Sequence, residues 1–411
     1  MTKTLLVGID VDSKHNECCF LDQEGNRTEK IFSVSNNLPG AQELEDKITT
    51  TMKNHSFEQL KIATEATSFL DLPLVDYLAT SEALRSYDPM IYQLNPRIVR
   101  GLKKAYADMD KVDPVDAFAV AERLRFGRLP EPYEEHQPYV PLRRLTRFRF
   151  HIVKDISREK NYFITHLFLK FSSYKSVKPF SDTFGATSQA VITEFFSLDE
   201  IASMSIDDLV AFLMKHGKNQ FSNPTEVADK LKKVARESYR LRPALASSVN
   251  LILALSLKNI RALEKIRNEL DRAIEKEFAA FPNTLQSIKG IGPVYSAGIY
   301  AEIGDIRRFH THSKLAKFSG LTWRKRSSGE FEAEFTPMTK TGNEYLRYYF
   351  IEAANMLRFH NDEYKAYYRT KYAEVTRHRH KRALALTARK LVRLVFALLK
   401  NNQLYQSSQE R

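Results

Sequence analysis

The chain has 411 residues, of which 43% are hydrophobic, so it is long enough for two or three domains with apolar cores. Its net charge of +13 favours a polyanionic partner, with nucleic acid ahead of a membrane surface. Cys18 and Cys19 are the only cysteines and are adjacent, which excludes a disulfide framework or a zinc site and fits a reducing cytoplasm. Asp10 interrupts the early apolar run and later apolar runs are short, so we expect no signal peptide and no membrane partner.

The first predicted strand, residues 4–11, carries acids on one face. Its apolar side chains alternate with Gly8, Asp10 and Asp12, and the two-residue period places both carboxylates on the same side. Charge on a buried strand is costly unless it is paired, and Mg²⁺ or Mn²⁺ suits such oxygen ligands. From this stretch alone, a solvated turn at the strand end explains Asp10 equally well.

Strands and helices then alternate in an α/β order. The patterns predict strands at 17–21, 26–34, 60–64 and 89–94, with helices at 39–52 and 71–79. This order predicts a domain with a ribonuclease H-like fold. The strand at 60–64 also ends in an acid, Glu65.

Three further acids, Asp110, Asp113 and Asp116, stand three residues apart. In a helix, Asp113 and Asp116 share one face. Helix capping alone explains both, because Asp113 is a good N-cap before Pro114 and Asp116 occupies the capping-box position.

The elements that carry these acids converge in a ribonuclease H-like fold. A cluster of like charges needs cations to coexist, and paired metal ions are a common solution for phosphoryl transfer. We therefore predict metal binding by four acids, with Asp12 and Asp110 as spare candidates. The four are Asp10, Glu65, Asp113 and Asp116.

Residues 129–141 are rich in Pro, Glu and Tyr and are predicted to be a linker. An arginine-rich stretch follows, in which Arg143, Arg144 and Arg147 are candidates for nucleic-acid binding. The chain is then predicted to be helical to about residue 278. Apolar series at 227–234 and 260–274 have coiled-coil-like spacing and suggest two long helices that form a dimerising arm, although an ordinary helical bundle fits equally well.

Gly290 and Gly292 lie between two predicted helices within residues 282–309. This is the pattern of a helix-hairpin-helix motif. The glycines allow a tight turn, and their N–H groups would face phosphate near a helix N-terminus.

Two serines, Ser327 and Ser328, lie beside Arg324 and Arg326. Arginines can hold a scissile phosphate and favour a nucleophilic alkoxide, but such a stretch is also typical of a plain turn. A short strand at 330–335 and a helix at 345–358 are predicted to follow.

The C-terminal tail is strongly basic. Residues 371–400 contain nine Lys or Arg and a single acid, Glu374, on a predicted helix with an apolar side. A basic amphipathic helix can contact a membrane, but beside the other features nucleic acid is the better partner. Arg379 and Lys381 are the candidate contacts.

Taken together, the motifs resemble those of DEDD-type transposases of bacterial insertion sequences, relatives of the Piv DNA invertases that are described as bridge-RNA-guided serine recombinases. The resemblance covers both ends of the chain in family order, and the middle matches only as a helical connector. It is carried by residues 8–11, 64–66, 95–96, 111–117, 288–293, 302–309, 318–321, 327–329 and 339–347.

The resemblance implies three domains and one composite site. A RuvC-like domain at 1–135 would bind Mg²⁺, or Mn²⁺ as an alternative, through the four acids named above. A helical coiled-coil connector would span 136–280, and a C-terminal transposase domain at 281–411 would supply a nucleophilic serine at Ser328. The two halves would meet across a dimer and exchange strands through a Holliday junction.

The implied partners are donor and target DNA, a structured noncoding guide RNA, and further copies of the chain, as a dimer or as a tetramer assembled on DNA. The protein would act in the bacterial cytoplasm at the nucleoid. The sequence departs from the family at Asp12, which gives Asp-Val-Asp-Ser-Lys, and its adjacent serines leave Ser327 and Ser328 both open as nucleophile.

Two other functions fit parts of the pattern. One is a metal-dependent nuclease that resolves Holliday junctions, in which the acids cut and the C-terminal half only binds DNA. The other is a nucleic-acid-binding protein without catalysis.

Overall fold

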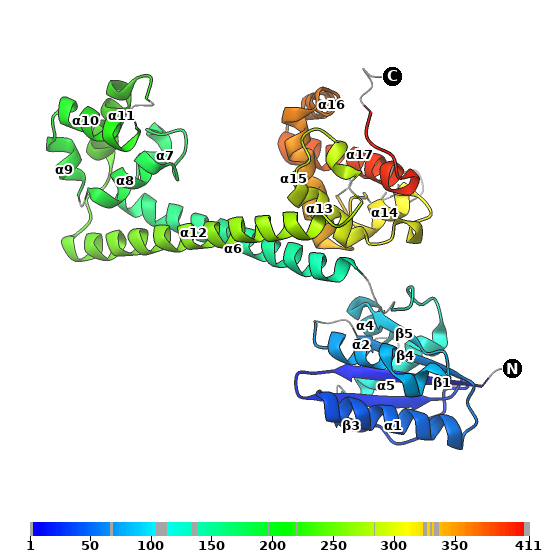
Figure 1. Ribbon diagram of the computed structural model, residues 1–411. Coiled ribbons are helices and arrows are strands. Elements are labelled where there is room, and N and C mark those ends of the chain that lie inside the picture. Colours follow the sequence, from blue (N-terminus) through cyan, green and yellow to red (C-terminus); the bar gives the residue numbers. More distant parts are fainter. Residues whose placement is uncertain are drawn as a thin grey trace. The chain divides into compact units, whose positions relative to one another are not determined.

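The computed structural model describes residues 3–65, 69–103, 113–133, 138–195, 197–218, 221–282, 284–323, 327–328, 331–332 and 337–406. The chain forms two compact units, Met1–Gln137 and Pro138–Arg411, which are drawn in Figure 1. The helical middle and the C-terminal part belong to the same unit, and the three-domain division at 135 and 280 stays a prediction.

The first unit is built on a five-stranded sheet in the order β3-β2-β1-β4-β5. Its central strand β1 pairs antiparallel with β2 and parallel with β4, and β4 pairs parallel with β5. This mixed sheet fits the predicted RuvC-like domain. The strands are β1 Thr4–Val11, β2 His15–Leu21, β3 Phe32–Ser35, β4 Gln59–Glu65 and β5 Met90–Leu94.

Helices cover both faces of this sheet, as the alternation in β1 requires. Leu5, Val7 and Ile9 are fully buried in the core formed with helices α1 (Leu38–Asn54) and α2 (Leu72–Thr80). The opposite face packs against α5 (Asp113–Phe126), with short helices α3 (Glu82–Arg85) and α4 (Pro96–Lys103) completing the unit. Gly8 and Asp10 therefore lie on the α5 side.

The strand predicted at 26–34 is shorter than expected. Asn26 is still held in the turn, because its backbone N–H donates to the Asp22 carboxylate at 2.8 Å. Arg27 makes only an isolated bridge to Leu21, and regular pairing begins at Phe32. The prediction was wrong because this side-chain contact extends the turn, a feature that strand propensity does not report.

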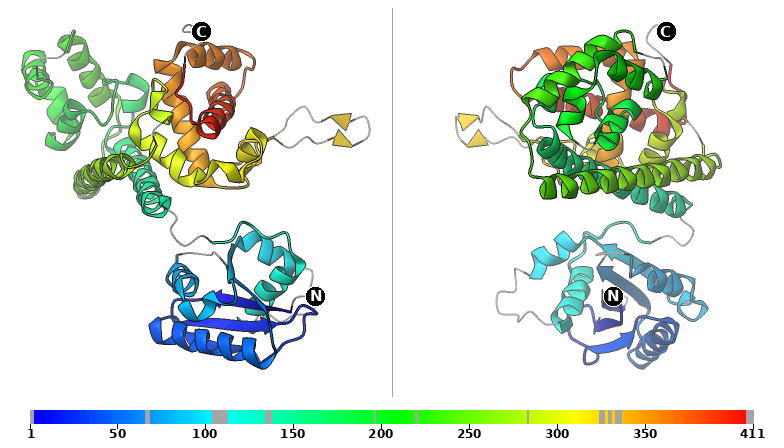
Figure 2. Two further views of the ribbon diagram at one scale, coloured as in Figure 1. Left: turned by 45° about the vertical axis from the view of Figure 1, so that its right-hand side comes forward. Right: turned by 90° about the vertical axis from the view of Figure 1, so that its left-hand side faces the viewer.

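The second unit contains two long helices, α6 (Tyr139–Lys170) and α12 (Pro243–Phe278), which pack along one another (Figures 1 and 2). The chain between them forms a small helical bundle with its own apolar core, here called the distal bundle. Its helices are α7 Tyr174–Val177, α8 Ala186–Glu194, α9 Leu198–Ser203, α10 Ile206–His216 and α11 Pro224–Glu237.

The first coiled-coil series predicted, at 227–234, belongs to the distal bundle. Asn223 caps α11 and the helix ends at Glu237, so its 14 residues provide two heptads at most. Leu231 and Val234 are buried in the bundle core instead. The second series lies in α12, whose long partner is α6. Among the described helices α12 is also long and apolar enough to cross a membrane; 28% of its apolar stretch is buried, and one of its faces packs on α6.

The C-terminal part packs α13, α15 and α17 around one core that includes Tyr349 and Phe350. A Cβ at Gly298 would lie 2.4 Å from the Tyr349 ring, so glycine is required where α13 meets α15. The elements are η1 Leu285–Ser287, α13 Pro293–Ile303, η2 Ile306–Arg308, α14 His312–Phe318, β6 Ser327–Ser328, β7 Phe331–Glu332, α15 Glu344–His360, α16 Asp362–Ala373 and α17 Arg379–Asn401.

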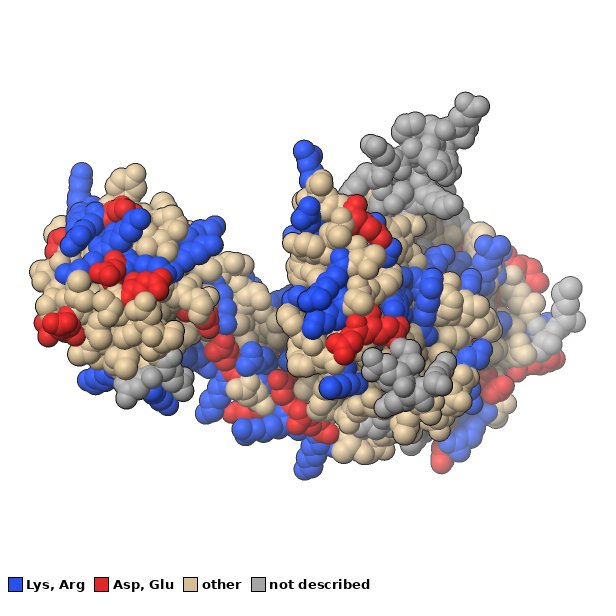
Figure 3. Space-filling model, turned by 90° about the horizontal axis from the view of Figure 1, so that it is seen from above, with Lys and Arg blue, Asp and Glu red and all other residues tan. Residues whose placement is uncertain are grey.

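The basic tail is two helices, because α16 ends at Ala373 and α17 begins after His378, which adopts a left-handed conformation (φ 53°). Leu391, Val392 and Val395 of α17 are fully buried in the C-terminal core, so the predicted apolar side faces the inside of the protein. Lys and Arg side chains remain gathered on the outside of this part (Figure 3).

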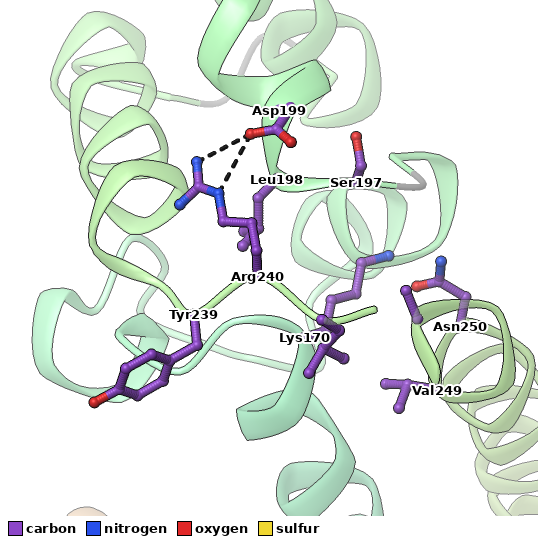
Figure 4. Close-up of a pocket in the computed structure, with 10 residues that line it drawn as sticks. Lys170, Ser197, Leu198, Asp199, Tyr239, Arg240, Val249 and Asn250 are labelled. Atoms are coloured by element: carbon purple, nitrogen blue, oxygen red, sulfur yellow. Dashed lines mark hydrogen bonds and ion pairs between the residues drawn. The ribbon is translucent and has the colours of Figure 1, made fainter. Parts of the chain in front are cut away.

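Lys170, the last residue of α6, joins the long helices to the distal bundle (Figure 4). Its ammonium donates to the carbonyl oxygens of Ile192 at 2.8 Å and Phe195 at 2.6 Å, at the C-terminal end of α8. Beside it, Arg240 pairs with Asp199 at 3.0 Å. Burial lowers the pKa of Lys170 from 10.5 to about 8, because the charged form loses hydration.

This buried lysine gives a pH prediction. Between pH 8 and 10 the folded state releases the Lys170 proton while the unfolded state keeps it, so the free energy of unfolding should rise with pH. The wild type should gain about 2 kcal/mol relative to Lys170→Met over this window. Urea unfolding of both proteins at pH 8 and pH 10 measures the difference.

The matched control is Lys175→Met, which removes an exposed lysine nearby and should have the same free energy of unfolding as the wild type at both pH values. A constant difference between wild type and Lys170→Met would contradict the assignment.

Candidate active site

Two predicted acids occupy neighbouring positions at the carboxyl ends of the parallel strands β1 and β4. Ile9 pairs with Thr64, so Asp10 and Glu65, one residue further on, come side by side. Residues in register on adjacent strands point to the same face, at a strand spacing of about 4.8 Å. Asp10 is half-buried, and Glu65 is 8% exposed.

The helix α5 crosses β1 at Gly8, where only glycine fits. A Cβ there would lie 2.3 Å from the Ala121 backbone N and 2.4 Å from the Ala117 carbonyl oxygen. The close approach sets how far α5 stands from the strand that carries Asp10.

The direction in which α5 runs follows from the position of its C-terminal end. Arg125 lies beside Gly25, in the turn after β2, and this turn is at the amino end of β1 because Leu6 pairs with Leu21. The first turn of α5, with Asp113 and Asp116, therefore lies toward the carboxyl end of β1, where Asp10 is.

The structure thus brings Asp10, Glu65 and the start of α5 to one edge of the sheet. Asp116 is half-buried there, Asp113 begins the helix with a side chain outside the described set, and Asp110 lies outside the described residues. Among the described side chains no three acids, histidines or cysteines lie close enough to hold a metal ion. The donor chemistry of Asp10, Glu65 and Asp116 is that of hard carboxylate oxygens, which fits Mg²⁺ or Mn²⁺.

Asp12 lies beyond the strand, which ends at Val11. Its carboxylate accepts hydrogen bonds from the Ser13 hydroxyl at 3.2 Å and the Lys14 backbone N–H at 3.3 Å. These bonds lower the pKa of Asp12, with the contacts to the Ser13 and Lys14 backbone as the main cause. Asp12 therefore stabilises the β1–β2 turn in this structure.

One buried acid near this edge was missed from the sequence. Asp71, only 2% exposed, accepts from the Thr64 hydroxyl at 3.0 Å and from the Gln93 amide at 2.8 Å. It ties the start of α2 to the ends of β4 and β5. Because Thr64 points to the face opposite Glu65, Asp71 supports the edge from the far side of the sheet. Its position just before a helix was the only signal, and capping explains that equally well.

In the second unit the two candidate serines form β6. Ser327 pairs with Glu332 and Ser328 with Phe331, so both lie on a short hairpin that stands away from the helices in Figure 2. Their side chains, and the neighbouring Arg324 and Arg326, lie outside the described set.

The root of this hairpin is firmly held. Trp323 bridges to Met338, and the Thr339 backbone N–H donates to the Thr322 carbonyl oxygen at 2.8 Å. Next to it, the Arg347 guanidinium donates to the carbonyl oxygens of Ser319 and Lys340, each at 3.2 Å. Both chain ends of the hairpin are thus attached to α15.

Behind this root lies a buried ion pair that the sequence did not reveal. Glu302, at the end of α13, accepts from Arg147 Nε at 2.6 Å and Nη2 at 2.9 Å, and from the Asn343 side-chain amide at 2.6 Å. Asn343 also caps α15 through the Leu346 N–H. Burial alone would lower the pKa of Arg147. The hydrogen bonds and the charge of Glu302 outweigh burial, so the pKa of Arg147 is raised.

Two of the first arginines make contacts within the second unit, and the nucleic-acid role predicted for them stays a prediction. Arg147 pairs with Glu302, and Arg143 donates to the Ala301 carbonyl oxygen at 2.8 Å, so both half-buried arginines join α6 to α13. Contacts of this kind look the same as a basic patch when only the sequence is read. For Arg144 the role stays a prediction.

The helix-hairpin-helix pattern is also incomplete. The element before Gly290 is the three-residue turn η1, and a helix, α13, follows only after Gly292. Gly290 has φ 103°, and a Cβ there would lie 2.9 Å from the His360 Cβ, so internal packing explains this glycine. The space around Gly292 is open, and phosphate contact there stays a prediction.

The tail candidates lie at the start of α17. Arg379 donates to the Val375 carbonyl oxygen at 2.8 Å and stacks over Tyr372, whereas Lys381 lines an open cleft.

Two family models match the chain. One, described as a transposase of the DEDD type of IS110, matches residues 7–171, and the other, described as the transposase IS116/IS110/IS902 family, matches residues 283–369. The first spans the acid edge and α6, and the second spans the hairpin with its supporting helices.

Curated relatives agree with these matches. The chain is 24% identical over 402 residues to a 44.8 kDa protein of insertion element IS116 from Streptomyces clavuligerus, covering 97% of this chain and 95% of the relative. It is 28% identical over 205 residues to the transposase for insertion sequence element IS1111A from Coxiella burnetii, covering 49% of this chain and 55% of that relative.

Proposed function

This chain belongs to the DEDD-type transposases of the IS110 and IS116 insertion sequences, and from that membership we propose that it exchanges DNA strands with a serine nucleophile and metal-binding carboxylates. The family implies action on DNA and dependence on a metal ion. The observation that carries the proposal is the meeting of Asp10, Glu65 and the start of α5 at one sheet edge.

The proposed metal is Mg²⁺, with Mn²⁺ as an alternative, held by Asp10, Glu65, Asp113 and Asp116. When bound, the ion would neutralise charge on a DNA phosphate and so favour attack on that phosphate by the nucleophile. The carboxylates themselves hold the ion and are oriented by β1, β4 and α5. Their shared edge supports this role, since like charges so placed repel one another without a cation.

The proposed nucleophile is Ser328, with Ser327 as the other candidate. Its hydroxyl oxygen would attack a DNA phosphorus, the bond from phosphorus to the strand oxygen would break, and a serine–phosphate ester would form, while the leaving strand oxygen takes up a proton in place of the one that the serine loses. Attack by the strand end of the second DNA would then release the serine and restore a phosphodiester. The firmly held hairpin root supports this role, because a nucleophile needs a fixed position.

We further propose that a structured noncoding RNA pairs with donor and target DNA, that dimers assemble into a tetramer on DNA, and that the halves of the site meet across the dimer. The protein would work at the nucleoid in the bacterial cytoplasm. The net charge of +13 supports contacts with several nucleic-acid backbones. A resolvase-like nuclease without strand joining is not favoured, because both matching families are transposases.

A reconstituted reaction tests the proposal. Purified protein, the RNA from beside its gene and two DNA substrates should yield joined products in Mg²⁺. Chelating the metal should lower the yield at least about 100-fold, because the ion stabilises the transition state by several kcal/mol. Omitting the RNA should remove sequence-specific joining. Joining at full rate in chelator, or without RNA, would contradict the respective part of the proposal.

A further inference from the structure

We propose that a cleft beside the serine hairpin binds an unpaired nucleotide of the DNA strand and stacks its base on Trp323. The inference rests on the proposed function and adds a binding site to it. The cleft has a volume of about 1180 Å³, larger than most pockets for small molecules. Its lining includes Trp323 and Met338 from the hairpin root, Arg377 from the turn before α17 and Lys381 from the first turn of α17.

The charge of the cleft selects an anion. Lys340, Arg377 and Lys381 line it, and none of the three forms an ion pair with another described residue. Arg382 also lines it but pairs with Glu374 at 2.9 Å, so the one acid among the described lining residues is already neutralised. Three cations near one another repel unless phosphate groups lie between them.

The first turn of α17 adds to this preference. A helix N-terminus carries partial positive charge and normally attracts acids, yet this turn contains Arg379, Lys381 and Arg382 and no acid. His378 at the N-cap makes no side-chain capping hydrogen bond to the free N–H groups. The cations at this end are repelled by the positive end of the helix dipole. A phosphate bound here would be attracted both by the cations and by the helix N-terminus.

Trp323 supplies the surface for a base. It is the only tryptophan in the chain and is half-buried at the cleft wall, where the bridge to Met338 fixes its backbone. Aromatic rings bind unpaired bases by stacking, whichever base is present. A ring set into a cleft can stack only on a base that has left the duplex, so the occupant is single-stranded or flipped out.

The position of Trp323 favours DNA over RNA. It lies four residues before Ser327 in the sequence, at the root of the hairpin that carries β6 and β7. In the proposed reaction the strand at these serines is DNA. A base held at the hairpin root would place the neighbouring phosphate along the hairpin.

The single tryptophan is also the reporter for the test. Full-length Ser328→Ala protein, which retains the cleft, is titrated with single-stranded DNA, single-stranded RNA and blunt duplex DNA of the same length. Single-stranded DNA should quench Trp323 fluorescence, and duplex should not. In fluorescence anisotropy titrations with a labelled oligonucleotide, Trp323→Ala should weaken single-strand binding about tenfold. Trp323→Phe should weaken it less than about threefold, because phenylalanine keeps an aromatic ring.

Matched charge variants separate the cleft from general basicity. Lys381→Ala should weaken single-strand binding about threefold to tenfold and flatten its salt dependence, whereas Lys233→Ala on α11, an exposed lysine of the distal bundle, should change it less than twofold. Unchanged fluorescence together with unchanged affinity of Trp323→Ala would overturn the proposal, as would tighter, Trp323-dependent binding of RNA. Because these readouts need no strand exchange, they stand apart from the outcome for the serine chemistry.

Discussion

Replacing Ser328 by alanine is expected to lower DNA strand exchange at least about 1000-fold, because the hydroxyl that forms the bond to phosphorus is lost. The backbone of β6 pairs with β7 whichever small side chain is present, so the hairpin should persist. Gel analysis of reconstituted reactions measures joined DNA, and denaturing gels measure covalent protein–DNA adducts, both of which should disappear. RNA and DNA binding should remain.

Ser327→Ala is the matched control, since it removes the same atom one position earlier on the same strand. Adjacent residues of a strand point to opposite faces, so only one of the two hydroxyls can face the DNA in a given arrangement. Ser327→Ala should therefore retain strand exchange within about tenfold. The reverse pattern would identify Ser327 as the nucleophile, and full activity in both variants would rule out serine chemistry.

Replacing Glu302 by alanine is expected to destabilise the second unit by about 3–5 kcal/mol, because Arg147 would be left without its partner in a buried site. The Glu302 side chain is fully buried and the Arg147 side chain is 26% exposed, so water could hydrate the arginine only in part. The Asn343 amide, which supports the cap of α15, would lose its acceptor as well. Urea unfolding followed by circular dichroism measures the loss.

Glu344→Ala is the matched control for this variant. Glu344 also pairs with a basic residue of α6, Lys154, but at 3.7 Å and with both side chains about half exposed. An exposed pair of this kind contributes about 0–1 kcal/mol, so the control should unfold close to the wild type. Equal stability of Glu302→Ala and Glu344→Ala would contradict a structural role for the buried pair.

The acid edge was accessible from the sequence because its determinants are local. The alternation in β1 defines one acid-bearing face, and the α/β order places the ends of β1 and β4 together. The alternating pattern did not reveal that Gly8 is there to admit α5, since a glycine in a strand has several uses.

The support of the serine hairpin was not accessible from the sequence. Arg147 and Glu302 are 155 residues apart, and nothing in either neighbourhood indicates the other. A row of arginines suggests a surface for nucleic acid, yet burial decides which of them reach solvent, and burial is set by the packing of α6 on α13. The same limit applies to residues 227–234. Their apolar spacing correctly indicated a helix with one buried face, but it did not indicate that this face packs in the distal bundle.

The distal bundle begins and ends at one place on the long helices. Lys170 at the end of α6 and Asn250 near the start of α12 line the same pocket, so the chain returns close to where it left (Figure 4). The two family models stop at 171 and resume at 283, so the distal bundle and α12 both lie between them. Because its two ends adjoin, the bundle could be replaced by a short turn without changing the spacing of the elements on either side. The packing of α6 on α12 is therefore independent of how long the segment between them is.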